Sequence, residues 1–287
     1  TRIGITAGKI GVGDVFDTNK YAHDPRGDFL NWSLVDTGSF DYAANAWGYT
    51  YGAAVEWYQG AWTLRGGLFT LSQIPNGEAL GTNLHQNEIA VEVEHRHTIL
   101  GRQGAVRVTG FRNRGMFSTY DDAVALARAT GAVPDLSLTR RMRNRSGIAL
   151  NIEQDITPNL GAFLRTGTTD GAIETYDFTD IDRTIAVGAA LKGKGWGRPQ
   201  DTFAIATVRN GISSSFQRYL AAGGLGVLVG DGALNHAGDE QIIEAYYAFR
   251  PLGWASMTVD YQHVANPGYN RDRGPANVFA MRLHAAI

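Results

Sequence analysis

The chain has 287 residues, a formal net charge of −2, no cysteine and 36 glycines. A net charge this close to zero excludes a strong general attraction to nucleic acid, and no apolar run reaches the roughly 18 residues that a transmembrane helix needs. Glycine is well above its usual ~7%, and together with the many aromatic residues this favours an all-β protein with numerous turns over a helical bundle.

Apolar and polar residues alternate in twelve segments of the chain, and a period of two is typical of β-strands. In chain order the expected strands are 2–12, 47–58, 61–71, 86–97, 104–115, 145–154, 160–169, 183–194, 201–210, 239–249, 254–264 and 277–287. Most are close to the ~9–11 residues of a tilted membrane-spanning strand. Two stretches outside them, 121–130 and 213–220, are expected to form short helices.

The connections between these segments alternate between short and long. The short ones are 59–60, 98–103, 155–159, 195–200 and 250–253, and the long ones are 13–46, 72–85, 116–144, 170–182, 211–238 and 265–276. Outer-membrane barrels have this asymmetry, with short periplasmic turns and long extracellular loops. The sequence therefore predicts a single domain, 1–287, that forms a transmembrane antiparallel β-barrel with both termini in the periplasm.

The segment 47–58 shows which face of the strands meets lipid. Trp47, Tyr49, Tyr51 and Trp57 share one face, whereas glycines and Glu56 lie on the other. Ten residues separate the two tryptophans, which is about 33 Å of strand and projects to about 25 Å at a tilt of ~40°. This is the distance between the two aromatic girdles of such barrels, so the aromatic face is predicted to contact lipid.

The opposite face carries charged residues of both signs, which the alternation directs into the lumen. Arg and Glu side chains hydrogen-bond to hydroxyl groups, and a lining of mixed sign suits a neutral, hydroxyl-rich solute better than an ion. The alternative is that these charges pair with one another and only hold the wall. The strand residues expected to contact solute are Glu56, Arg65, Glu92, Arg107 and Arg165.

Four stretches carry a resemblance to a known family. They are FDTNKYAHDPRGDFLNW (16–32), DFTDIDRT (177–184), YLAAGGLGVLVGDG (219–232) and ANPGYNRDRGP (265–275). Together they resemble the carbohydrate-selective porin (OprB) family of Gram-negative outer membranes, and the similarity runs along essentially the whole chain.

The resemblance implies a diffusion channel for monosaccharides, glucose above all, without catalytic residues, metal or cofactor. It also implies a barrel of sixteen strands, so that four N-terminal strands are expected to be missing from this sequence. A loop that folds into the mouth of the channel and narrows it is expected at Asp24, Arg26, Asp28, Asn31 and Trp32.

Three other functions remain open from the residues alone. A barrel that serves polysaccharide export or another envelope assembly would show no preference for hexoses, and a general porin would select by size. A soluble carbohydrate-binding β protein would stay in solution without detergent. The expected partners are monosaccharides, outer-membrane lipid and lipopolysaccharide, with a homo-oligomer possible and no nucleic acid.

Overall fold

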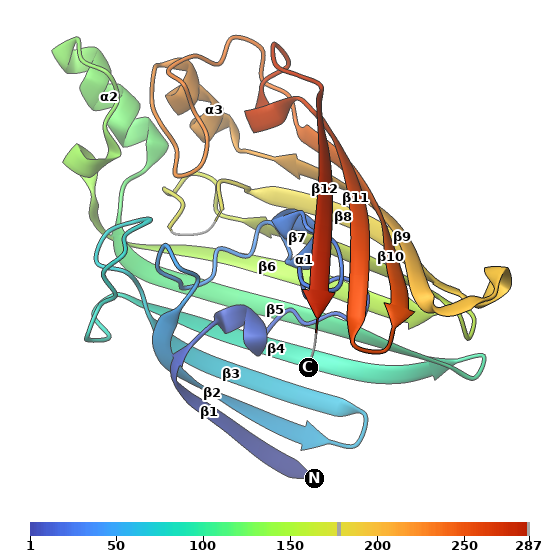
Figure 1. Ribbon diagram of the computed structural model, residues 1–287. Coiled ribbons are helices and arrows are strands. Elements are labelled where there is room, and N and C mark those ends of the chain that lie inside the picture. The colour runs from blue at the N-terminus through green and yellow to red at the C-terminus, as the bar shows by residue number, and fades with distance from the viewer. Residues whose placement is uncertain (177–178, 286–287) are drawn as a thin grey trace.

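The computed structural model describes residues 1–176 and 179–285. The expected positions Asp177, Phe178, Ala286 and Ile287 lie outside the described residues. Twelve antiparallel strands form one sheet in chain order and curve around a central space, the lumen (Figure 1). The strands are β1 (Arg2–Ile10), β2 (Thr50–Gln59), β3 (Trp62–Thr70), β4 (Asn87–Ile99), β5 (Arg102–Phe117), β6 (Arg141–Asp155), β7 (Leu160–Thr169), β8 (Arg183–Gly193), β9 (Arg198–Gly211), β10 (Glu240–Leu252), β11 (Ala255–Ala265) and β12 (Ala276–Ala285). This confirms the predicted twelve-stranded all-β architecture.

Long and short connections separate to opposite ends of the sheet (Figure 1). Short turns such as 60–61, 100–101 and 156–159 lie at one end, where both termini also lie. The long connections gather at the other end, and β1 and β12 are the two edge strands of the sheet. We call these the short-turn end and the long-connection end.

The outer face of the sheet is apolar, as the alternation in the sequence predicts. In β2, Tyr51, Val55 and Trp57 are exposed, whereas Thr50 and Ala54 of the same strand are buried. Large apolar side chains are exposed on the outer face of the other strands too, among them Trp62, Ile89, Val91, Ile148, Ile185, Val187, Val259 and Met281. A belt of this size is stable only in an apolar solvent, so it marks the lipid-facing side.

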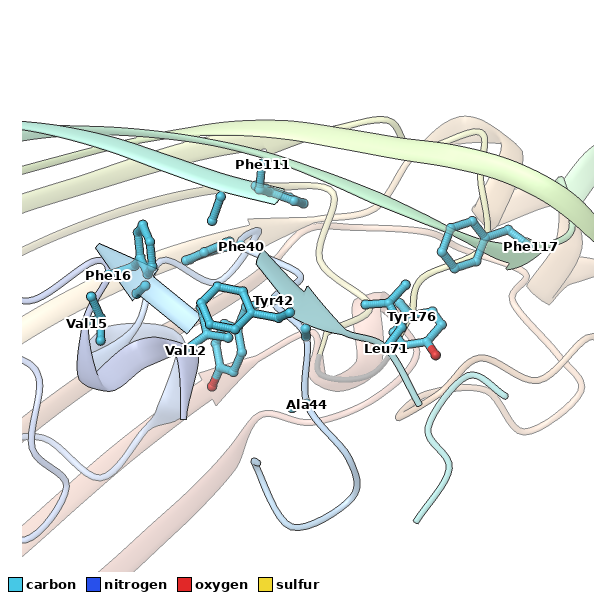
Figure 2. Packing of buried hydrophobic residues seen from close by; sticks show 14 of the residues in the cluster. Val12, Val15, Phe16, Phe40, Tyr42, Ala44, Leu71, Phe111, Phe117 and Tyr176 are labelled. Carbon is cyan, nitrogen blue, oxygen red and sulfur yellow. The ribbon is translucent and has the colours of Figure 1, made fainter. Parts of the chain in front are cut away.

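The connection between β1 and β2, residues 11–49, turns inward and fills part of the lumen (Figure 1). We call it the lumen loop. It contains a short 3₁₀ segment, η1 (Val12–Asp14), and one helical turn, α1 (Trp32–Val35). Figure 2 shows Phe16 and Phe40 of this loop packed near Phe111 of β5, and the rings of Phe40 and Phe111 lie 5.0 Å apart. Burial of these rings, at about 25 cal/mol per Å² of apolar surface, holds the loop inside the sheet.

A small helical cap covers the long-connection end. It contains α2 (Tyr120–Thr130) and α3 (Ser214–Ala221), which confirm the two expected helices, together with η2 (Leu136–Thr139) and η4 (Pro267–Tyr269). Side chains of Thr119 and Ser213 cap the first turns of α2 and α3. The rings of Tyr120 and Phe216 stack 4.4 Å apart and join the two helices. The remaining short element, η3 (Lys194–Trp196), lies in a short turn.

Strands β5 and β6 are longer than the strands 104–115 and 145–154 that the sequence predicts. Their pairing continues to Phe117 and Arg141, beyond the neighbouring hairpins. Arg141 and Arg143 contact the carboxylate of Asp122 in α2 at the projecting end. The cap therefore stabilises an extension of β5 and β6 that the local sequence pattern does not predict. None of the helices in the described ranges is long and apolar enough to cross a membrane.

We expect the cap to respond to pH through Asp180. This buried carboxylate accepts backbone N–H groups of Leu228 at 2.7 Å and Val229 at 2.9 Å, and its burial raises the pKa of Asp180 to about 6. We call the conformation in which Asp180 is buried against residues 227–229 the closed form, and one in which Asp180 is hydrated the open form. In the open form the carboxyl would titrate near 4, so the closed form binds a proton more readily than the open form. The closed form is therefore favoured at pH 4 and loses about 3 kcal/mol as the pH rises through 6. Hydrogen exchange of residues 226–229, corrected for the intrinsic rate, should be faster at pH 8 than at pH 5. Asp180→Asn should remove this difference, and an unchanged difference would contradict the assignment to Asp180.

Candidate functional site

The lumen loop is anchored by buried polar side chains from many strands. Asp17 lies at its centre, where its N–H donates to Glu92 of β4 at 2.8 Å and its carboxylate accepts the amide of Asn151 in β6 at 2.7 Å. The same carboxylate accepts the backbone N–H of Thr37, 20 residues further along the loop, at 2.5 Å. Asp17 therefore ties two parts of the loop to each other and to the wall.

Arg165 of β7, the cross-strand neighbour of Asn151, fixes the loop from the same side of the wall. Its guanidinium donates to the carbonyl oxygens of Ala22 and Leu34, both at 2.6 Å, and of Asp17 at 2.9 Å. Nε also lies 3.5 Å from the Asp17 carboxylate. Arg165 has no exposed surface. In this conformation it holds the loop backbone and does not line the open lumen.

Further anchors lie in the middle of the loop and toward its β2 end. Glu244 of β10 accepts the N–H groups of Leu30 at 2.5 Å and Asn31 at 2.9 Å. The side chain of Asn31 caps α1 and donates to Gln262 of β11 at 3.1 Å. Near β2, Glu88 of β4 accepts the N–H of Ala43 at 2.6 Å. The loop is thus pinned to strands on several sides of the lumen, which fixes its course across the channel.

Four of the expected strand residues form one ionic network on the inner face of β2 to β6. Arg65 contacts Glu56 at 3.0 Å, Glu92 at 2.6 Å and Glu94 at 3.1 Å. Arg107 bridges from Glu94 at 2.9 Å to Glu153 of β6 at 3.1 Å. We call Glu56, Arg65, Glu92, Glu94, Arg107 and Glu153 the ionic wall. The charges pair with one another and are mostly buried. This is the alternative described above, in which the inward charges hold the wall and do not contact solute.

The other expected residues lie on the lumen loop with very different exposure. Arg26 is the most open, with 83% of its side chain exposed, and it pairs with Asp24 at 2.9 Å. The hydrogen bond from Arg26 holds the pKa of Asp24 below its usual value. Asp28 is half-buried and accepts the N–H groups of His23 and Asp24. Trp32 packs against the apolar core under the cap. Arg26 is the exposed member of the predicted set, and Asp24 and Asp28 near it on the loop are half-buried.

Reasoning from the sequence missed Asp17, Asn151 and Lys20. Lys20 donates from its backbone N–H to Glu153 and from Nζ to Asp155, both at 2.7 Å. Asn151 carried a detectable signal, because it is an amide on the inward face of a strand with apolar neighbours. Asp17 and Lys20 carried none, since loop residues have no alternation that assigns them a side.

The geometry describes a membrane-spanning wall, an inward loop and a charged lumen, with no group of three or more metal-ligating side chains within residues 1–176 and 179–285. The model of the family described as "Carbohydrate-selective porin, OprB family" matches residues 1–286. The chain belongs to this family. This porin is therefore a carbohydrate channel of the Gram-negative outer membrane.

A solved structure shares the fold of this porin. OprB of Pseudomonas putida is similar with a TM-score of 0.77 and 17% sequence identity, over 99% of this chain and 69% of that one. OccAB1 of Acinetobacter baumannii is similar with a TM-score of 0.48 and 12% identity, over 83% of this chain and 67% of that one. No curated protein sequence matches the porin.

Proposed function

We propose that this porin is a passive channel for monosaccharides, glucose among them, with its long connections facing the cell exterior and its termini in the periplasm. The lumen loop is the observation that carries the proposal. Buried pairs on β4, β6, β7 and β10 fix the loop across the lumen, so the passage beside it has a defined width and lining. Selection among small polar solutes requires such a constriction, and passage requires that each contact be weak.

Within this channel we propose that two groups of charged residues have different roles. Asp24, Arg26 and Asp28 exchange hydrogen bonds with sugar hydroxyls, because they lie at the accessible edge of the loop. The ionic wall and Arg165 give the constriction its shape. All four carboxylates of the wall pair with its two arginines and are largely buried, so the wall presents few free charges to a solute.

Uptake into liposomes that contain the complete purified protein tests the proposal. Glucose should enter faster than amino acids of similar size, and its entry should saturate at high concentration. Entry ranked by size alone would instead show a general porin. Stable co-purifying envelope proteins without hexose entry would show a component of an export assembly.

Arg26→Ala should reduce glucose uptake with little effect on stability, because the side chain is mostly exposed. We expect a change of about fivefold, which corresponds to one hydrogen bond of roughly 1 kcal/mol. Arg209→Ala is the matched control, since Arg209 is also an exposed arginine paired with an aspartate, Asp239, but lies on the outer face. Equal uptake by the two variants would remove Arg26 from the solute pathway.

A further inference from the structure

A cavity of about 300 Å³ lies between the lumen loop and the inner face of the sheet, near the short turn 156–159. We call it the short-turn pocket. The wall is set back there because Gly161, Ala190 and Ala248 add little volume. A side chain at Gly161 would overlap the ring of Tyr21, so the glycine lets the loop approach β7 closely. The pocket is large enough for one monosaccharide.

Three cations from separate elements line this pocket: Lys20 of the loop, Lys192 of β8 and Arg250 of β10. Lys20 is neutralised by Asp155 at 2.7 Å. Lys192 bonds only to the hydroxyl of Thr202, at 3.0 Å. Across the described ranges 1–176 and 179–285, neither Lys192 nor Arg250 has a carboxylate within ion-pair distance.

The two carboxylates that line the short-turn pocket are already engaged. Asp155 accepts from Lys20 and from the hydroxyl of Tyr21. Asp28 accepts two backbone N–H groups of its own loop, from His23 at 3.1 Å and Asp24 at 3.0 Å. The pocket therefore presents an excess of positive charge that its own acids do not balance, in contrast to the paired ionic wall.

Groups suited to a sugar surround these cations. The rings of Tyr21 and Tyr246 line the pocket, and aromatic faces pack against the C–H face of a pyranose. Tyr21 is held in place by its bond to Asp155 and by its contact with Gly161. Thr202 and Asn159 supply further polar groups for hydroxyls.

We propose that the short-turn pocket binds a sugar acid, a monosaccharide that carries one carboxylate, with Lys192 and Arg250 holding the carboxylate. The inference rests on the proposed function, because the sugar arrives through the same lumen. A neutral hexose would leave both cations without a counter-charge, whereas a simple inorganic anion would leave the rings and most of the cavity unused. The ligand that satisfies both features combines a pyranose ring with one negative charge.

Binding to the complete purified protein in detergent, measured by titration calorimetry, tests this separately from transport. D-Glucuronate and D-glucose are the matched probes, because they differ only in whether carbon 6 is a carboxylate. We expect glucuronate to bind on the order of tenfold more tightly than glucose. This is the difference in affinity that one hydrogen bond to a charged group typically contributes. Lys192→Gln with Arg250→Gln should abolish this preference. Arg112→Gln with Arg114→Gln is the control, since it removes two exposed cations from the outer face.

Three results would overturn the proposal. Equal affinities for glucuronate and glucose would show that the cations do not contact ligand. Acetate binding as tight as glucuronate would show a general anion site without sugar recognition. Retained preference in the Lys192→Gln, Arg250→Gln variant, with its fold confirmed by circular dichroism, would place the anion elsewhere. Failure of the proposed function is distinguishable, because it appears in the liposome uptake assay and not in this titration.

Discussion

Channels that carry Arg165→Met are expected to conduct several times more current than the unchanged protein and to lose their preference for sugars. The substitution keeps the approximate length of the side chain but removes the guanidinium donors to the carbonyl oxygens of Ala22, Leu34 and Asp17. It also leaves the buried carboxylate of Asp17 without its cation. Breaking a buried pair on one side costs about 3–5 kcal/mol. The loop should therefore leave its position and widen the passage.

Single-channel recording in planar bilayers, combined with limited proteolysis, measures this release. Cleavage within residues 11–49 should become faster in the variant. Arg183→Met is the matched control, because Arg183 is an exposed arginine on the outer face of β8. If Arg165→Met lowers the melting temperature while conductance and cleavage stay the same, Arg165 supports the strands and not the loop.

Arg65→Met is expected to lower stability and to make the channel favour cations. Arg65 is the shared partner of Glu56, Glu92 and Glu94, so its loss leaves several acids close together and largely buried. We expect a loss of about 3–5 kcal/mol in the free energy of unfolding and a reversal potential shifted toward cation selectivity. The stability and selectivity of Arg65→Lys should lie between those of the unchanged protein and of Arg65→Met. A lysine keeps the positive charge, but one ammonium group cannot reach three carboxylates in the geometry of a guanidinium.

A double-mutant cycle separates the pair from the network. Glu92→Gln combined with Arg65→Met should recover part of the lost stability and selectivity, because it removes one of the stranded charges. Glu92 also accepts from Asp17 and Thr109, so the recovery is expected to be incomplete. Strict additivity of the two changes would mean that Arg65 and Glu92 do not interact in the membrane.

The sequence by itself determined the wall of this porin. Alternation in segments such as 47–58 decides which side chains face lipid, because in a strand the side is set by residue number alone. The alternation of short and long connections likewise orders the hairpins, since antiparallel neighbours are joined locally. Family resemblance in 16–32 implied a loop that folds into the mouth of the channel, although it did not say how such a loop is held.

Only the tertiary structure decided what the inward charges do. Asp17 and Arg165 are 148 residues apart, and Lys20 and Asp155 are 135 apart. Whether a lumen arginine faces solute or a partner depends on the loop that covers it, and a loop has no repeating pattern to predict its course. Arg65 and Arg165 therefore look like Lys192 in sequence, as cations on the inward face of a predicted strand. In the structure the two arginines are enclosed by acids and carbonyls, whereas Lys192 lines an open cavity. Burial and pairing are properties of the assembled lumen, and they separate the residues that shape the channel from those left free to bind its cargo.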